Sequence, residues 1–213
     1  MGCPSAARAA GGAHVIDDSE VETPGLCHVE ESAAILSGGG RMATISPGCT
    51  SRSHSTIELG GYAAYGRIGG IDDGAIGFSP KIELRPVNAG FGLGIDGAIG
   101  FGLRHRRIES ASIIVPLSVA LSTIVQVNFN IGGLWSAADH AARGFGGAQL
   151  TAQLRPKLQL MAESFAWTGH PPGGQIGLRW TIDGGRTDLD LLAARYPDGI
   201  ARSAVTLGLT LRR

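Results

Sequence analysis

His28, Glu30 and Ser32 occupy alternate positions near the N-terminus, so on an extended strand their side chains share one face. Histidine, carboxylate and hydroxyl groups together are the set that serine hydrolases use, where histidine removes the proton of the nucleophile. The same residues also suit a plainer role as polar lining at the end of a β-barrel, and the pattern favours that role. We therefore expect no catalytic site, no metal site and no cofactor.

Two carboxylates in the segment "RTDLDLL", Asp188 and Asp190, also point the same way on a strand. Paired carboxylates can perform acid–base chemistry. However, the neighbouring strands carry Arg179 and Arg212. This arrangement favours a network of salt bridges inside a barrel over a catalytic pair.

The elements that position these residues are short strands with alternating apolar and polar side chains, as in "TIVQVNFNIGGLWS" at 123–136. Turns rich in Gly, Pro, Asp and Asn separate the strands. The predicted strands span 26–36, 41–48, 55–67, 74–86, 90–104, 108–121, 123–135, 144–154, 157–167, 173–182, 186–196 and 202–212. About twelve strands joined in sequence predict an all-β, up-and-down antiparallel barrel.

Composition narrows the class of protein. The 213 residues include 34 glycines, and the formal net charge is zero. Electrostatic binding of nucleic acid normally requires a basic excess, so no nucleic-acid partner is expected. No apolar run approaches the ~18 residues of a membrane-spanning helix, whereas strands of about ten residues are long enough to cross a membrane in a barrel.

The two faces of the strands differ in side-chain size. One face carries large apolar residues, and the other carries Gly, Ala, Ser, amides and charges of both signs. Lipid outside and a narrow lumen inside explain this difference, although a soluble barrel that binds an apolar ligand remains an alternative. The residues expected to line the lumen are Glu58, Lys81, Glu83, Arg85, Asp96, Arg104, Gln126, Asn128, Asn130, Glu163, Arg179, Asp188 and Asp190.

Four aromatic residues, Tyr65, Trp135, Trp167 and Tyr196, fall at the C-terminal ends of predicted strands that all reach the same rim. Tyr and Trp gather at membrane–water interfaces in barrels of this kind. We therefore expect them to form an aromatic girdle, with core packing as the alternative interpretation.

Cys27 and Cys49 are equally distant from Gly38, the centre of the first predicted hairpin, so they lie opposite each other across it. We expect a disulfide, which requires an oxidising compartment. Closing a loop of this length stabilises the fold by about 3 kcal/mol.

The chain divides into an N-terminal segment at 1–24 and a barrel domain at 25–213. The segment contains "ARAA", which resembles the end of a secretory signal, but no basic and apolar stretch precedes it. We expect the segment to be either a signal remnant or a plug in the mouth of the barrel.

The segment "GGQIGLRWTIDGGRTDLDLLAARYPDGIARSAVTLGLTLRR" resembles the closing hairpins of proteobacterial outer-membrane β-barrels, and "VETPGLCHVE" and "SPGC" resemble the first hairpin of a poorly characterised, transporter-like family of such barrels. One departure is Arg213 where these barrels usually end in Phe. The resemblance implies a Gram-negative outer-membrane location, with the lipid bilayer and the outer-membrane assembly machinery as partners. It implies a porin-like barrel that transports small polar solutes. A non-conducting structural or adhesive barrel and a lipid hydrolase or acyltransferase remain alternatives.

Overall fold

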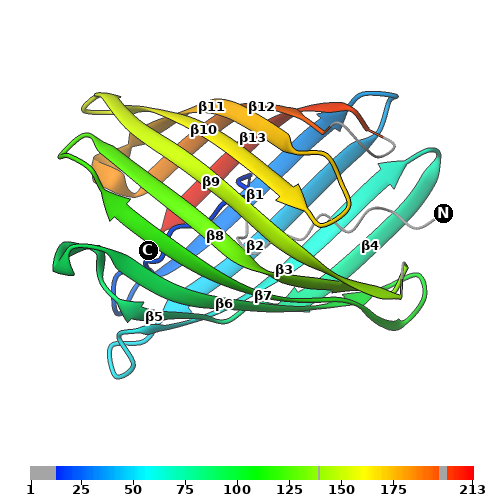
Figure 1. Cartoon of the computed structure of the whole chain (residues 1–213), viewed down its shortest axis with the longest axis horizontal. Coiled ribbons are helices and arrows are strands. Elements are labelled where there is room, and N and C mark those ends of the chain that lie inside the picture. The colour runs from blue at the N-terminus through cyan, green and yellow to red at the C-terminus, as the bar shows by residue number, and fades with distance from the viewer. Residues whose placement is uncertain (1–12, 139, 197–200) are drawn as a thin grey trace.

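The computed structural model describes residues 13–138, 140–196 and 201–213, which form one antiparallel sheet closed into a barrel (Figure 1). The first and last strands close the ring through pairs that run from His28↔Arg212 to Leu36↔Ala204. The strands are β1 (Cys27–Leu36), β2 (Arg41–Thr50), β3 (Ile57–Ile68), β4 (Ile71–Phe78), β5 (Lys81–Arg85), β6 (Gly92–Gly102), β7 (Arg107–Ala120), β8 (Val125–Ser136), β9 (Ala141–Arg155), β10 (Leu158–Trp167), β11 (Gly173–Ile182), β12 (Thr187–Arg195) and β13 (Ser203–Arg212).

In the described part of the chain, helical structure is limited to two short 3-10 helices, η1 (Val87–Ala89) and η2 (Asp183–Gly185). Within the described ranges, no helix has the length and apolar character needed to cross a membrane.

β4 and β5 together occupy one position in the barrel, because β3 and β6 each pair with both of them. The interruption falls at Ser79 and Pro80, where proline has no N–H to donate. Hydrogen bonds from Ser79 N to Gly60 O (2.9 Å) and from Gly97 N to Pro80 O (3.0 Å) keep the wall connected. The barrel thus has twelve strand positions, which confirms the predicted fold class, but the single strand expected at 74–86 is two strands.

Alternation along each strand separates the two faces of the wall. In β8, Phe129 and Ile131 are 47% and 69% exposed on the outer surface, whereas Asn128 and Asn130 are 1% and 3% exposed. The same alternation recurs in β12, where Asp188 and Asp190 are buried and the intervening Leu189 is exposed. The amide and carboxylate groups therefore face the interior.

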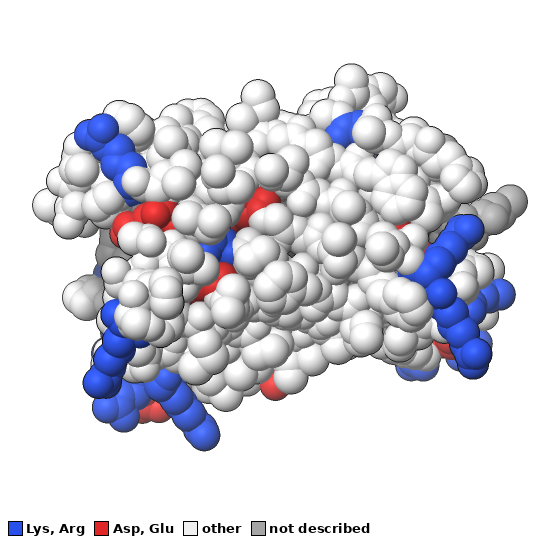
Figure 2. Space-filling view, turned by 90° about the horizontal axis from the view of Figure 1, so that it is seen from below, with Lys and Arg blue, Asp and Glu red and all other residues white. Residues whose placement is uncertain are grey.

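The outer surface is mostly apolar between two charged ends. Figure 2 shows Lys and Arg gathered at both ends of one face; the surface between them is mostly uncharged, apart from a group of acidic and basic atoms left of the centre. Large apolar side chains such as Ile35 and Leu207 stand well exposed on the outer wall. A barrel that crosses a bilayer needs this kind of apolar band, because lipid cannot hydrate charged groups.

Cys27 and Cys49 form a disulfide between β1 and β2, with their Cα atoms 4.0 Å apart. The predicted pairing is confirmed, and the remaining Cys3 lies outside the described residues. We call the end of the barrel that carries this disulfide and Arg212 the disulfide-side mouth. The opposite end, which carries the β3–β4, β6–β7 and β8–β9 turns, is called the loop-side mouth.

Candidate functional site

A cavity of about 610 Å³ occupies the disulfide-side half of the lumen. Eight of its lining residues are Asp or Glu and three are Lys or Arg, so acidic side chains predominate. The acidic residues are Asp17, Asp18, Glu20, Glu22, Glu30, Glu58, Glu83 and Asp96, and the basic residues are Lys81, Arg179 and Arg212.

Residues 13–24 run inside the barrel and contact inward-facing side chains. The imidazole of His14 lies between two carboxylates, with Nδ1 2.7 Å from Oε1 of Glu163 and Nε2 3.3 Å from Oδ2 of Asp190. The backbone N–H groups of Val15 and Ile16 both donate to Oε2 of Glu163, at 3.0 and 3.3 Å. One buried carboxylate on β10 therefore fixes three consecutive residues of the inserted segment.

Ile16 gives the inserted segment an apolar contact as well. Its side chain is 1% exposed and belongs to a buried cluster with Ile114, Phe145 and Phe165. The lumen at this level is filled by side chains, because the aromatic ring of Phe165 is also only 1% exposed.

The next residues of the segment bind side chains on β8, β7 and β5, further round the wall from β10. Asp17 accepts a hydrogen bond from Lys81 Nζ (2.9 Å), and its backbone exchanges two hydrogen bonds with the side-chain amide of Asn130 (2.9 and 2.8 Å). The N–H of Ser19 donates to Oγ of Ser118 at 2.9 Å, and both serines are fully buried. The ion pair of Asp17 with Lys81 and the hydrogen bonds made by the backbone of Asp17 and Ser19 therefore hold the segment in one position.

Salt bridges also link the segment to the C-terminal strands. Arg212 contacts Glu22 at 3.1 Å and Asp188 at 2.8 Å. Arg179 forms a two-pronged ion pair with Asp190, in which both N···O distances are 2.8 Å. The structure thus brings together the arginines and aspartates whose network the strand pattern indicated.

Protonation of His14 depends on its two carboxylate partners. Burial by itself lowers the pKa of the imidazole, but hydrogen bonds with Asp190 and then Glu163 outweigh burial and raise the pKa from 6.5 to about 9. At neutral pH His14 is therefore a cation placed between two anions.

Most residues expected to line the lumen lie inside the barrel. Glu58, Lys81, Glu83, Asp96, Gln126, Asn128 and Arg179 line the cavity. Asn130, Glu163, Asp188 and Asp190 are buried and make the contacts described above. Arg85 instead lies over the ring of Phe91, with its guanidinium carbon 4.0 Å from the ring centroid.

Arg104 is a correction to the predicted lining. It lies in the exposed turn between β6 and β7, because β6 ends at Gly102 and not at the predicted residue 104.

The aromatic girdle stays a prediction for two of its four residues. Tyr65 and Trp135 are exposed on the outer surface. Trp167 and Tyr196 instead pack against the buried ring of Phe165, with centroids 5.4 and 5.7 Å away, so their assignment to the girdle is wrong. The physical reason is strand parity, since Trp167 lies an even number of positions from the inward-facing Glu163 on the same strand.

Two members of the hydrolase-like set, His28 and Glu30, line the cavity. The ring nitrogens of His28 lie 3.8 Å from the carboxylates of Glu22 and Glu58. This placement makes His28 part of the charged lining of the cavity.

Sequence reasoning treated residues 1–24 as one segment and did not identify His14, Asp17 or Glu22 as interior groups. Those of its residues before 13 lie outside the described part of the chain. The segment has no strand periodicity, so nothing in it marked which side chains would meet Glu163, Lys81 or Arg212 more than sixty positions away. The density of acidic residues in "IDDSEVE" was the available signal.

Known structures share this architecture. The KdgM porin matches with a TM-score of 0.70 and 6% sequence identity, over 86% of this chain and 98% of the porin. The NanC porin matches with a TM-score of 0.64 and 8% identity, over 86% and 98% of the two chains. The COG4313 outer membrane channel from Pseudomonas putida F1 matches with a TM-score of 0.65 and 10% identity, over 92% and 98%. The fold is therefore that of bacterial outer-membrane β-barrels.

In sequence, the model of a family described as "Uncharacterised conserved protein UCP029691" matches residues 2–213. No curated protein matches the chain.

Proposed function

The chain belongs to the family of uncharacterised conserved protein UCP029691, and from its outer-membrane barrel fold and polar interior we propose that it is a channel for small polar solutes. The observation that carries this proposal is the cavity of about 610 Å³ in the disulfide-side half of the lumen, with its charged lining. In the proposal the barrel stands in the outer membrane, surrounded by lipid, after insertion by the outer-membrane assembly machinery. The twelve-strand wall supplies the passage, and residues 13–24 control it.

The inserted segment acts as the plug in this proposal. It crosses the interior between Glu163 on one side and Lys81 on the other, and Ile16 fills the lumen beside Phe165. Solute flow then requires the segment to move. Such movement is feasible because the segment is held by side-chain hydrogen bonds and ion pairs, whereas the strands are held by continuous backbone ladders.

The charge of the cavity supports neutral or cationic solutes. Its eight acidic residues exceed its three lysines and arginines, and like charge repels anions in a confined, poorly hydrated space. The KdgM porin forms a complex with oligogalacturonate, an acidic saccharide. This chain lacks the basic excess that a polyanion would require in its cavity, so we propose a different solute class for it.

Planar-bilayer conductance tests the channel and the plug together. The complete chain and a variant without residues 1–24 are refolded and compared, with a heat-modifiable gel shift as the control that both barrels are closed. We expect the shortened variant to conduct several times more current than the complete chain. A folded but silent shortened barrel contradicts the channel proposal and favours a non-conducting structural or adhesive barrel.

A cross-link tests whether the segment must move. Ser19 and Ser118 are buried neighbours, so the double variant Ser19→Cys, Ser118→Cys is expected to lock the segment to β7. We expect the oxidised variant to conduct less than the native chain and to recover after reduction. The native chain under the same reductant is the matched control, because its Cys27–Cys49 disulfide is exposed to the same treatment.

A further inference from the structure

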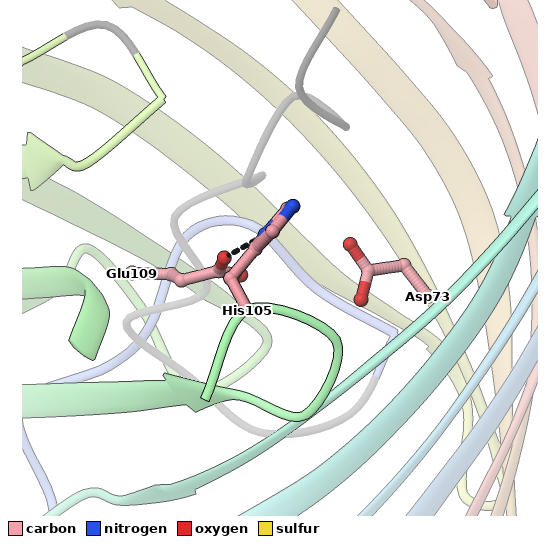
Figure 3. Close-up of side chains that lie close together, drawn as sticks. All are labelled: Asp73, His105 and Glu109. Atoms are coloured by element: carbon pink, nitrogen blue, oxygen red, sulfur yellow. Dashed lines mark hydrogen bonds and ion pairs between the residues drawn. The ribbon is translucent and has the colours of Figure 1, made fainter. Parts of the chain in front are cut away.

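Three side chains with metal-binding groups meet at the loop-side mouth, at the end of the barrel away from the charged cavity. Asp73 comes from β4, His105 from the β6–β7 turn and Glu109 from β7 (Figure 3). One ligand atom from each residue lies within 4.8 Å of the other two. Asp73 and Glu109 are half-buried and His105 is exposed, so the group is both held by the wall and accessible to ions.

Backbone hydrogen bonds fix the position of the Asp73 carboxylate beside the β6–β7 turn. β4 pairs with β6 through Ala75↔Gly102, and Leu103 N donates to Gly74 O at 2.8 Å, which holds the β6–β7 turn beside Asp73. Oδ1 of Asp73 accepts a hydrogen bond from Gly74 N at 2.8 Å. The Asp73 carboxylate is therefore oriented before any ion arrives.

A β-bulge in β7 determines the direction of the Glu109 side chain. In the β6–β7 ladder, Gly100 pairs with Ser110 and Phe101 pairs with Ile108, so Glu109 has no residue opposite it. Bulges of this kind redirect a side chain. Here the redirected carboxylate lies across Gly102, where a methyl group in place of the glycine hydrogen would collide with it. Only glycine at 102 leaves this position open to Glu109.

The donor set suits a divalent transition metal. Nδ1 of His105 already lies 2.5 Å from Oε1 of Glu109, so a metal ion would replace the proton that the two atoms now share. One imidazole nitrogen and two carboxylate oxygens are the donors that zinc accepts, with water completing the coordination. Bonds of about 2.1 Å place tetrahedral donors roughly 3.4 Å apart, so His105 and Glu109 must move apart by about 1 Å to admit the ion, which an exposed imidazole can do.

We propose that Asp73, His105 and Glu109 bind one divalent transition-metal cation, zinc by preference, at the loop-side mouth. The bound ion ties β4 to the β6–β7 hairpin across their turn ends. The proposal does not depend on whether the lumen conducts, because none of the three residues lines the cavity or contacts residues 13–24.

Zinc titration of the complete chain tests the site. The protein is refolded in detergent without a polyhistidine tag and titrated with zinc by isothermal calorimetry. We expect one equivalent of zinc to bind, and we expect His105→Gln, Glu109→Gln and Asp73→Asn each to weaken binding at least tenfold. Asp72→Asn is the matched control, because Asp72 is the chain neighbour of Asp73 but hydrogen-bonds Tyr65. Its affinity should stay within twofold of the native value.

A second measurement needs no variant. Diethyl pyrocarbonate modifies accessible histidines, and mass spectrometry locates each modification. We expect saturating zinc to protect His105 and to leave His54, an exposed histidine at the other mouth, reactive. Equal reactivity of His105 with and without zinc, or zinc affinity undiminished in His105→Gln and Asp73→Asn, overturns the proposal.

Discussion

The two halves of the lumen differ in chemistry although the same strands form both. The disulfide-side half holds the cavity and carries inward charges such as Glu58 and Lys81. The loop-side half contains two buried apolar clusters, one around Phe165 and one of Leu36, Ile68 and the alanines around them. In β12, for example, the buried Asp188 and Asp190 lie toward the disulfide side, and the buried Leu192 and Ala194 lie toward the loop side.

This difference explains how a narrow barrel can be closed without a large internal domain. Apolar side chains pack densely against one another and exclude water on the loop side. Charged side chains on the disulfide side need partners, since an unpaired buried charge costs several kcal/mol. Residues 13–24 provide those partners, and Ile16 joins the two halves because its N–H binds Glu163 while its side chain packs with Phe165.

Removing Glu163 is the largest expected disturbance of the polar half. Its carboxylate accepts hydrogen bonds from His14, from two backbone N–H groups and from the amides of Gln149 and Gln175. Glu163→Ala leaves these buried donors without an acceptor, and we expect the free energy of unfolding to fall by about 3–5 kcal/mol. Denaturant unfolding in lipid vesicles measures the loss.

Gln126→Ala is the control for Glu163→Ala, because Gln126 also lines the cavity but donates only to Asn128. We expect it to cost about 1 kcal/mol. Equal costs for the two variants would mean that the segment is not anchored through Glu163.

A charge placed on the outer wall should be the next largest disturbance. Ile131 is 69% exposed near the middle of β8, and an arginine near the bilayer midplane costs about 2–4 kcal/mol. We expect Ile131→Arg to lose this amount in vesicle unfolding. Gln126→Arg, which faces the acidic cavity from the same strand, should change stability by less than about 1 kcal/mol. A tolerated Ile131→Arg would argue that this face does not contact lipid.

Features that depend on local alternation could be predicted from the sequence. Strand positions, the inward direction of Asn128 and the Cys27–Cys49 pair all follow from a period of two residues about known turns. Trp167 was assigned by its place at a strand end instead of by its parity with Glu163, although parity decides which face a side chain occupies. Pro80 interrupts the predicted strand at 74–86 for a reason that was visible in the sequence, its missing N–H.

Contacts between residues that lie far apart in the sequence could not be predicted. Asp73 and Glu109 meet because β4 lies beside β6 and because one bulge shifts the β6–β7 ladder. A shift of one residue would send Glu109 to the other face. Contacts of His14 with Glu163 and Asp190 span more than a hundred positions and follow no periodic pattern. Such contacts require the closed barrel before they can be identified.

Alkaline pH should weaken the hold of the wall on residues 13–24. The pKa of His14 is about 9 with the segment in place and 6.5 when it is free. The contribution of His14 is therefore fully present below about pH 6.5 and is lost as the pH rises through 9, by at most about 3 kcal/mol. Besides Glu163 and Asp190, two more charged groups act on His14. The like charge of Arg179 lowers the pKa of His14, and the other group is the carboxyl of Glu30.

Residues 13–24 contain no Lys or Arg for trypsin to recognise, so a broad-specificity protease applied to vesicle-inserted protein is used to report release of the segment at each pH. We expect cleavage within residues 13–24 to increase between pH 7 and pH 10, and we expect His14→Gln to remove most of this pH dependence. A native profile that matches the His14→Gln profile would assign the dependence to another group.

The smallest expected effect is a difference in how strongly lipid quenches the fluorescence of tryptophans on the two faces of the wall. The chain has three tryptophans. Trp135 is exposed on the outer wall, and Trp167 packs inside against Phe145 and Phe165. Brominated lipid quenches only indole rings that it can approach closely. With Trp180 replaced by Phe, we expect a variant that keeps only Trp135 to be quenched and a variant that keeps only Trp167 to be nearly unaffected. Equal quenching would place the Trp167 ring at the lipid boundary and restore it to the aromatic girdle, because strand parity would then no longer decide its face.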